Sequence, residues 1–192
     1  MRQVKPVKVG DCTLDGKHIY IQSMLNTRSD DIEGSAAQAA ALEQAGCEII
    51  RAAIPNRDAI ALIPAIKERI HFDYRLALEA AAAGIDKIRI NPGNIGGMDR
   101  VRAVVKACQE RSIPIRIGVN SGSLEKEILA KYGAPTAEAL VESAMGHVRM
   151  LEACDFDNIV ISMKSSDVNT MIEAYRLCAR QCHYPLHLGV DI

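Results

Sequence analysis

The chain has 192 residues, of which 48% are hydrophobic and 24% charged, so one ordinary core is expected rather than two domains. Its formal net charge of −1 excludes a global field that would attract nucleic acid or an anionic membrane. No run of about 18 apolar residues is present, which argues against a membrane-spanning helix. The first residues lack the apolar region of a signal peptide, so we expect a cytoplasmic protein.

Short apolar runs and longer helical stretches alternate along the chain. The β-branched runs predict strands at Ile19–Met24, Glu48–Ile54, Lys87–Asn91, Ile115–Asn120, Asn158–Lys164 and Pro185–Val190. The stretches between them predict helices at Ile32–Ala45, Arg57–Arg69, Tyr74–Ala83, Arg100–Arg111, Ala137–Ala153 and Val168–Cys182. Continuously apolar strands separated by helices indicate a parallel sheet that is covered on both faces.

The helix ends carry residues that suit them. Gly46 and Gly84 follow two helices at the position where a left-handed backbone is favoured. Thr136 and Asp167 precede two others as N-caps, and Asp73 is a further candidate cap.

The order of elements predicts an α/β fold of the TIM-type (β/α)8 barrel. A long β-α series without a Gly-x-Gly-x-x-Gly fingerprint favours a barrel over an open dinucleotide-binding sheet. Six strands are found where a barrel has about eight, so we expect an incomplete barrel. One internal strand is missing between helices Arg57–Arg69 and Tyr74–Ala83, and the end of the barrel is missing after Ile192.

Four predicted strands each bring one basic side chain to the face where a barrel binds its ligands. These residues are Arg51, Arg89, Arg116 and Lys164. Because strand side chains alternate with period two, three of these basic residues each share a strand face with a polar residue. The companions are Asn91 for Arg89, Asn120 for Arg116, and Ser162 for Lys164.

A cation in an apolar strand is costly unless it is paired or meets an anion. One such residue is commonly a structural ion pair, but four on separate strands favour an anion site, and guanidinium groups suit a diphosphate. His71 with Asp73 is a candidate acid or base, although Asp73 is equally a helix cap. His187 either faces the pocket or sits in the core.

The six cysteines form no Cys-x-x-Cys pair and stand mostly among apolar neighbours. Buried thiols in a reducing compartment are therefore expected, and the sequence predicts no metal ligands in this chain.

The strand-end motifs resemble one enzyme family, the 4-hydroxy-3-methylbut-2-enyl diphosphate synthases, over essentially the whole chain. The longest are Lys-Ile-Arg-Ile-Asn-Pro-Gly-Asn-Ile-Gly, Pro-Ile-Arg-Ile-Gly-Val-Asn-Ser-Gly-Ser-Leu, Ser-Met-Lys-Ser-Ser-Asp, His-Phe-Asp-Tyr-Arg-Leu-Ala-Leu and Pro-Leu-His-Leu-Gly-Val. The resemblance implies reductive conversion of 2-C-methyl-D-erythritol 2,4-cyclodiphosphate to 4-hydroxy-3-methylbut-2-enyl diphosphate in non-mevalonate isoprenoid biosynthesis. It also implies a homodimer that takes electrons from ferredoxin or flavodoxin through a [4Fe–4S] cluster.

Carried onto this sequence, the resemblance implies that the four basic residues bind the diphosphate, with Asn91, Asn120 and Ser162 orienting it. It places His71 and His187 near the substrate. The family holds its cluster on a C-terminal domain that has no counterpart here, so residues 1–192 are expected to form the substrate-binding barrel domain alone. The family also has about eight more residues before His71, of the length of a strand and its loop.

Two other functions stay open on the sequence alone. One is a pterin-diphosphate-binding barrel of the dihydropteroate synthase kind. The other is a truncated binding module without turnover, which fits the expectation that the 192 residues alone are inactive.

Overall fold

The structure is a computed structural model that describes residues 3–53, 58–69, 86–90 and 98–189. In chain order its elements are β1 (Val7–Val9), β2 (Cys12–Leu14), β3 (Gln22–Met24), α1 (Ile32–Gln44), β4 (Ile49–Arg51), η1 (Asp58–Ala61), α2 (Leu62–Arg69), β5 (Ile88–Ile90), α5 (Met98–Glu110), β6 (Ile115–Asn120), η2 (Ser121–Ser123), α6 (Lys126–Tyr132), α7 (Ala137–Glu152), β7 (Ile159–Lys164) and α8 (Val168–Gln181).

The strands form two parallel sheets and one antiparallel hairpin. Strands β3 and β4 pair in parallel, and β5, β6 and β7 form a three-stranded parallel sheet in that order. The segment after α8 joins the second sheet through a single bridge between Ile161 and Leu186. The described strands thus give the parallel β-α architecture predicted from the sequence, as two sheets rather than one closed barrel.

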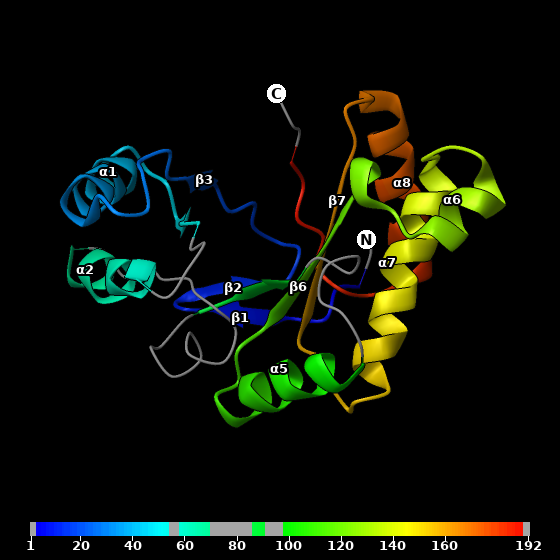
Figure 1. Ribbon diagram of the computed structural model, residues 1–192, viewed down its shortest axis with the longest axis horizontal. Helices are drawn as coiled ribbons and strands as arrows, with labels where there is room; N and C mark the ends of the chain where they lie inside the picture. Colours follow the sequence, from blue (N-terminus) through cyan, green and yellow to red (C-terminus); the bar gives the residue numbers. More distant parts are fainter. Residues whose placement is uncertain (1–2, 54–57, 70–85, 91–97, 190–192) are drawn as a thin grey trace.

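The three-stranded sheet has an apolar face and a polar face because its side chains alternate with period two. Ile115, Ile117 and Val119 of β6 are buried among the helices α5, α7 and α8. The opposite face of β6 carries Arg116 and Asn120, and it is the inner face of the fold. Figure 1 shows these helices gathered on one side of the sheet, with α1 and α2 at the far side of the molecule.

The hairpin of β1 and β2 lies against the inner face of the sheet. Val7 and Val9 pack on Val160, an inward-facing residue near the start of β7. A hairpin in this place covers the amino-terminal end of the inner face, so the space left on that face lies towards the carboxyl ends of the strands.

Most predicted elements are confirmed, with shorter strands than the sequence indicates. Predicted strand Ile115–Asn120 matches β6, and the caps at Thr136 and Asp167 are confirmed because each side chain accepts a backbone hydrogen bond. Gly46 has a φ of +90°, as its place after α1 requires. The candidate cap Asp73 and the glycine Gly84 lie outside the described residues.

The run at the carboxyl end, the two hairpin strands and one helix differ from the prediction. The run Pro185–Val190 is not a strand over its described part, where it makes only the bridge at Leu186. The hairpin β1–β2 and the helix α6 are absent from the prediction, since their short runs give too few periods to stand out. The predicted helix Tyr74–Ala83, and the gap before it, lie outside the described residues.

Candidate functional site

A cavity of about 290 Å³ lies on the inner face of the two parallel sheets. Residues from five strands line it: Met24, Arg51, Arg89, Arg116, Asn120, Ser162 and Lys164. Four of these described lining residues are basic, and none of them carries a carboxylate. We call the four basic residues, Arg51, Arg89, Arg116 and Lys164, the basic cluster.

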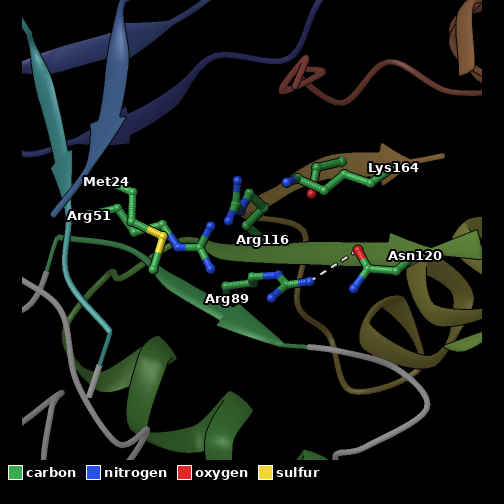
Figure 2. Close-up of a pocket in the computed structure, with 7 residues that line it drawn as sticks. Met24, Arg51, Arg89, Arg116, Asn120 and Lys164 are labelled. Carbon is green, nitrogen blue, oxygen red and sulfur yellow. Dashed lines mark hydrogen bonds between the residues drawn. The ribbon is translucent and has the colours of Figure 1, made fainter. Parts of the chain in front are cut away.

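The basic cluster converges on one space. Figure 2 shows Arg51, Arg89, Arg116 and Lys164 around one space, with the Arg89 guanidinium directed to Asn120 and the amine of Lys164 directed towards Arg116. Like charges held this close repel one another, and an anion between them would offset that repulsion. The cavity is therefore suited to a small ligand with two or more negative charges.

Strand register explains why the cluster forms. The parallel pairing places Arg89 beside Arg116, while further along the sheet Asn120 lies beside Lys164. In the other sheet Arg51 lies beside Met24. Arg116 is the deepest member, with 3% of its surface exposed, because it is the second residue of β6 whereas Lys164 ends β7.

A glycine makes room for Arg89. A Cβ placed on Gly118 would stand 2.3 Å from Arg89 Nε, so only a residue without a side chain lets the guanidinium lie across β6. In that position Arg89 Nη2 donates to the Gly118 carbonyl at 3.5 Å and to the Asn120 amide oxygen at 3.4 Å. Asn120 thus holds Arg89 in place as well as lining the cavity (Figure 2).

Ser162 lines the cavity, but its hydroxyl hydrogen already has an acceptor. Its Oγ donates to the carbonyl of Ile117 at 3.2 Å, across the β6–β7 pair. A hydroxyl used in this way offers lone pairs rather than a donor to an anion. Its contribution to anion binding in this arrangement is therefore smaller than that of the basic residues.

His187 lies near the basic cluster, although it is not among the lining residues. Burial, followed by the positive charges of Arg116, Lys87, Arg51 and Lys164, lowers the pKa of His187 to about 3. The imidazole is therefore neutral at physiological pH. The sequence leaves open whether His187 faces the pocket or lies in the core. Its electrostatic interactions with the basic cluster favour the pocket.

Tyr175 of α8 fixes the backbone at His187. Its hydroxyl donates to the His187 carbonyl at 2.5 Å and accepts from Met163 N at 2.9 Å. Burial raises the pKa of Tyr175 to about 12, so the hydroxyl keeps its proton. The sequence alone does not indicate that Tyr175 holds this backbone, because a tyrosine in a predicted helix is usually interpreted as a core residue.

Sequence reasoning also missed Lys87 and Met24. Lys87 precedes β5 and is two residues from Arg89, so strand periodicity could have placed it on the inner face. Methionine is usually core filler, yet Met24 is 43% exposed and lines the cavity. The predicted site residues His71 and Asn91 lie outside the described residues.

The cysteines are dispersed. Cys12, Cys47, Cys108, Cys178 and Cys182 are buried as free thiols, and Cys154 is half-buried. Within the described part of the chain, no group of three His, Cys, Asp or Glu side chains could hold a metal ion. No helix in the same part is long and apolar enough to cross a membrane.

Comparison with known proteins gives one family. The model of the GcpE TIM-barrel domain matches residues 4–191. The chain is 54% identical to the 4-hydroxy-3-methylbut-2-en-1-yl diphosphate synthase (flavodoxin) of Geobacillus thermodenitrificans, over 98% of the chain and 53% of that protein. It is 53% identical to the enzyme of the same name from Halalkalibacterium halodurans, over 98% of the chain and 54% of that protein. The chain therefore spans about half the length of the curated relatives it matches.

Solved structures support the fold alone. A type I 3-dehydroquinate dehydratase from Clostridium difficile aligns with a TM-score of 0.71 at 13% identity, over 97% of this chain and 81% of that one. The 7,8-dihydropteroate synthase of Vibrio fischeri aligns with a TM-score of 0.61 at 15% identity, over 95% of this chain and 77% of that one.

Proposed function

The chain belongs to the GcpE TIM-barrel domain family, and on that premise we propose that it supplies the diphosphate-binding barrel of a 4-hydroxy-3-methylbut-2-en-1-yl diphosphate synthase. The observation that carries the proposal is the cavity lined by the basic cluster. The proposed reaction is reductive ring opening with dehydroxylation: 2-C-methyl-D-erythritol 2,4-cyclodiphosphate takes up two electrons and two protons and gives the linear 4-hydroxy-3-methylbut-2-enyl diphosphate and water. The proposed roles of the residues follow from charge and geometry.

The basic cluster binds the diphosphate. Arg51, Arg89 and Arg116 present planar forks that can each contact two phosphoryl oxygens, whereas Lys164 acts as a point charge. Asn120 keeps Arg89 at the cavity through its amide oxygen. Asn91 and Ser162 are the proposed orienting residues, and His71 and His187 are proposed to lie beside the carbon skeleton.

The basic cluster also favours the ring opening. Opening the cyclodiphosphate breaks a bond between carbon and a phosphate oxygen, and that oxygen leaves with the electron pair. The diphosphate is then more negative than in the bound substrate. Fixed cations in a buried site stabilise this developing charge more than the ground state, so part of the barrier is lowered by residues that stay in place.

The described residues do not fit an iron–sulfur cluster. Such clusters are held mainly by Cys thiolates, commonly four. Here the two buried thiols of Cys178 and Cys182 lie 3.8 Å apart on α8, and no group of three ligands is found among the described side chains. We therefore assign no step of the reaction to a cluster held by these residues.

We propose that residues 1–192 correspond to the barrel domain, and that the [4Fe–4S] cluster belongs to a C-terminal domain of the family. The greater length of the relatives supports a further domain in the family. The alignment itself spans 197 positions, which exceeds the 192 residues of this chain. The relatives thus contain residues within the matched region that this chain lacks, which supports an incomplete barrel. A flavodoxin or ferredoxin donor, a homodimer and a cytoplasmic location complete the proposal.

The two alternatives are weaker. The likeness to dihydropteroate synthase is one of fold at 15% identity, whereas the relatives at 54% identity bear the synthase name. A binding module without turnover uses the same cavity, so it differs from the proposal only in the redox step.

Calorimetric titration of the chain with 2-C-methyl-D-erythritol 2,4-cyclodiphosphate tests the proposal. We expect binding, and a loss of affinity of about 10- to 100-fold in both Arg116→Ala and Lys164→Ala, since a hydrogen bond to a charged group contributes about 1.5–3 kcal/mol. Arg176→Ala on the exposed face of α8 and Lys106→Ala on α5 serve as matched controls.

Unchanged affinity in both cluster variants would remove the anion site, and tighter binding of a pterin diphosphate would favour the alternative enzyme class. An assay for product formation with reduced flavodoxin distinguishes the catalytic barrel from a binding module without turnover. Product formation by the 192-residue chain would contradict its expected inactivity alone.

A further inference from the structure

We propose that Lys87 is a fifth basic group of this anion site, one that takes up a proton when a diphosphate binds to the basic cluster. The inference rests on the proposed function, because it requires an anion in the cavity. It adds a residue to the site and assigns a proton to the binding step.

Lys87 is buried without a visible structural use. It is 9% exposed, and its Nζ has no hydrogen-bond partner among the described residues. A buried ammonium with neither an acceptor nor solvent is among the most costly groups in a protein interior. A lysine in such a place is retained at a cost in stability, so a functional use for it is expected.

The strand position of Lys87 puts it on the same face as the basic cluster. It stands directly before β5 and shares the inner face with Arg89, two residues further on. Register places Arg89 beside Arg116, the deepest residue of the basic cluster. Lys87 therefore lies one step nearer the amino-terminal end of the inner face than Arg89, and its charge interacts with Arg116 and with Cys12 of β2.

Among the described residues, several charged and titratable groups act electrostatically on Lys87. They are Arg116 of β6, Arg51 of β4, Cys12 of β2 and Asp86 of its own segment, while His187 after α8 feels Lys87 together with Lys164 of β7. Burial, followed by the charge of Arg116, lowers the pKa of Lys87 to about 7, and the opposing influence of Cys12 and Asp86 is smaller. Without an anion, about half of the Lys87 amines are neutral near that pH.

An anion in the cavity places negative charge beside the cations that act on Lys87. The diphosphate charge offsets the cations that disfavour the Lys87 ammonium, so the amine becomes more basic and binds a proton from solvent. The ammonium then attracts the anion in turn, and this reciprocity links affinity to pH. The Lys87 ammonium would also stabilise the additional negative charge that ring opening places on the diphosphate.

The test is calorimetric titration with inorganic diphosphate in two buffers that differ in ionisation enthalpy. At about pH 7.5 we expect the wild-type chain to take up on the order of half a proton more than Lys87→Met, because the amine is mostly neutral before binding. The difference should vanish at about pH 5.5, where Lys87 is already charged. The ligand's own protons contribute equally to both proteins, and repeating the titration with sulfate removes that contribution.

Two further variants sharpen the result. Lys106→Met on the exposed face of α5 should leave the proton uptake unchanged. Lys87→Arg, which is charged throughout, should bind diphosphate but lose the same fraction of a proton as Lys87→Met. Should Lys87→Met fail to fold, the wild-type affinity for sulfate carries the test: it should fall between pH 6 and pH 8.5, by at most about tenfold for each pH unit above 7, and a pH-independent affinity would overturn the inference.

Equal uptake in wild type and Lys87→Met would overturn this inference while leaving the anion site intact. Loss of the uptake in His187→Gln instead would assign the proton to His187 and equally overturn it. Failure of the wild-type chain to bind any of these anions would overturn the proposed function and this inference together.

Discussion

The two parallel sheets of this molecule are supported very differently. The sheet of β5, β6 and β7 lies beneath α5, α7 and α8, and one continuous core fills the space between them. The pair of β3 and β4 has a much smaller core under α1 and α2, and Ile19 and Ile21, which precede β3, are exposed. Figure 1 shows these two parts on opposite sides of the hairpin.

The difference teaches how the anion site is built. Three members of the basic cluster, including Arg116, stand on the well-packed sheet, where their positions are fixed by register. Arg51 is the last residue of a three-residue strand in the smaller part. We infer that the larger part preorganises most of the site, while the smaller part contributes a single charge from the other side.

The largest expected effect compares matched leucines in the two cores. Leu140 of α7 is fully buried, and Leu62 of α2 is 2% exposed. We expect Leu140→Ala to cost about 3–5 kcal/mol of unfolding free energy and Leu62→Ala about 2–3, since cavity cost grows with the packing around the site. Urea unfolding followed by circular dichroism gives both values, and a larger cost at Leu62 would contradict the comparison.

The next effect concerns Lys87. Its folded pKa of about 7 lies below the ordinary value of 10.5, so the unfolded chain binds more protons between these two pH values. Stability therefore rises with pH across that window, and the cost of burying the ammonium is greatest below about pH 7. We expect Lys87→Met to raise the unfolding free energy by roughly 2–4 kcal/mol at neutral pH.

Urea unfolding of Lys87→Met across pH checks this, and the gain should shrink as pH approaches 10.5, the ordinary lysine pKa. A gain independent of pH would mean that packing, rather than charge, causes it.

A smaller effect on stability and affinity is expected from Gly118, which leaves room for the Arg89 side chain on the well-packed sheet. Gly118→Ala must displace Arg89, whose Nε lies 2.3 Å from the added Cβ. We expect a cost of about 1–2 kcal/mol in stability and about a tenfold loss of diphosphate affinity. Gly146→Ala in α7 is the control, because a Cβ there meets nothing within 4 Å and alanine favours the helix. Equal affinity in both variants would show that Arg89 needs no such space.

The smallest effect separates stability from binding within the larger part. Thr136 caps α7 by accepting from Ala139 N. We expect Thr136→Ala to cost about 1 kcal/mol in urea unfolding and to leave diphosphate affinity unchanged, because the cap is remote from the basic cluster. A matching loss of affinity would indicate that the site depends on the sheet's overall stability.

The well-packed part could be predicted closely from the sequence. In the predicted helix Ala137–Ala153, Leu140, Ala144, Val148 and Leu151 stand at helical spacing and are all buried, and β6 matches its predicted bounds. Register then brought the basic cluster to one cavity, as the shared parity of the strand residues implied. Periodic patterns identify elements well where one face is packed and the other is polar.

The remainder depends on contacts that one sequence does not reveal. The β1–β2 hairpin pairs in strands of three residues, and its packing on Val160 joins segments remote in the chain. The segment around His187 reads as a strand but is held by Tyr175 and a single bridge. The strand parity of Lys87 could have been read from the sequence, whereas its burial depends on tertiary contacts that the sequence does not show.

The most direct test of the account is a crystal structure of the chain with inorganic diphosphate bound. The account predicts the anion in the cavity, with its oxygens within hydrogen-bonding distance of Arg51, Arg89, Arg116 and Lys164. An anion bound elsewhere on the molecule, with these four side chains paired to carboxylates instead, would contradict it.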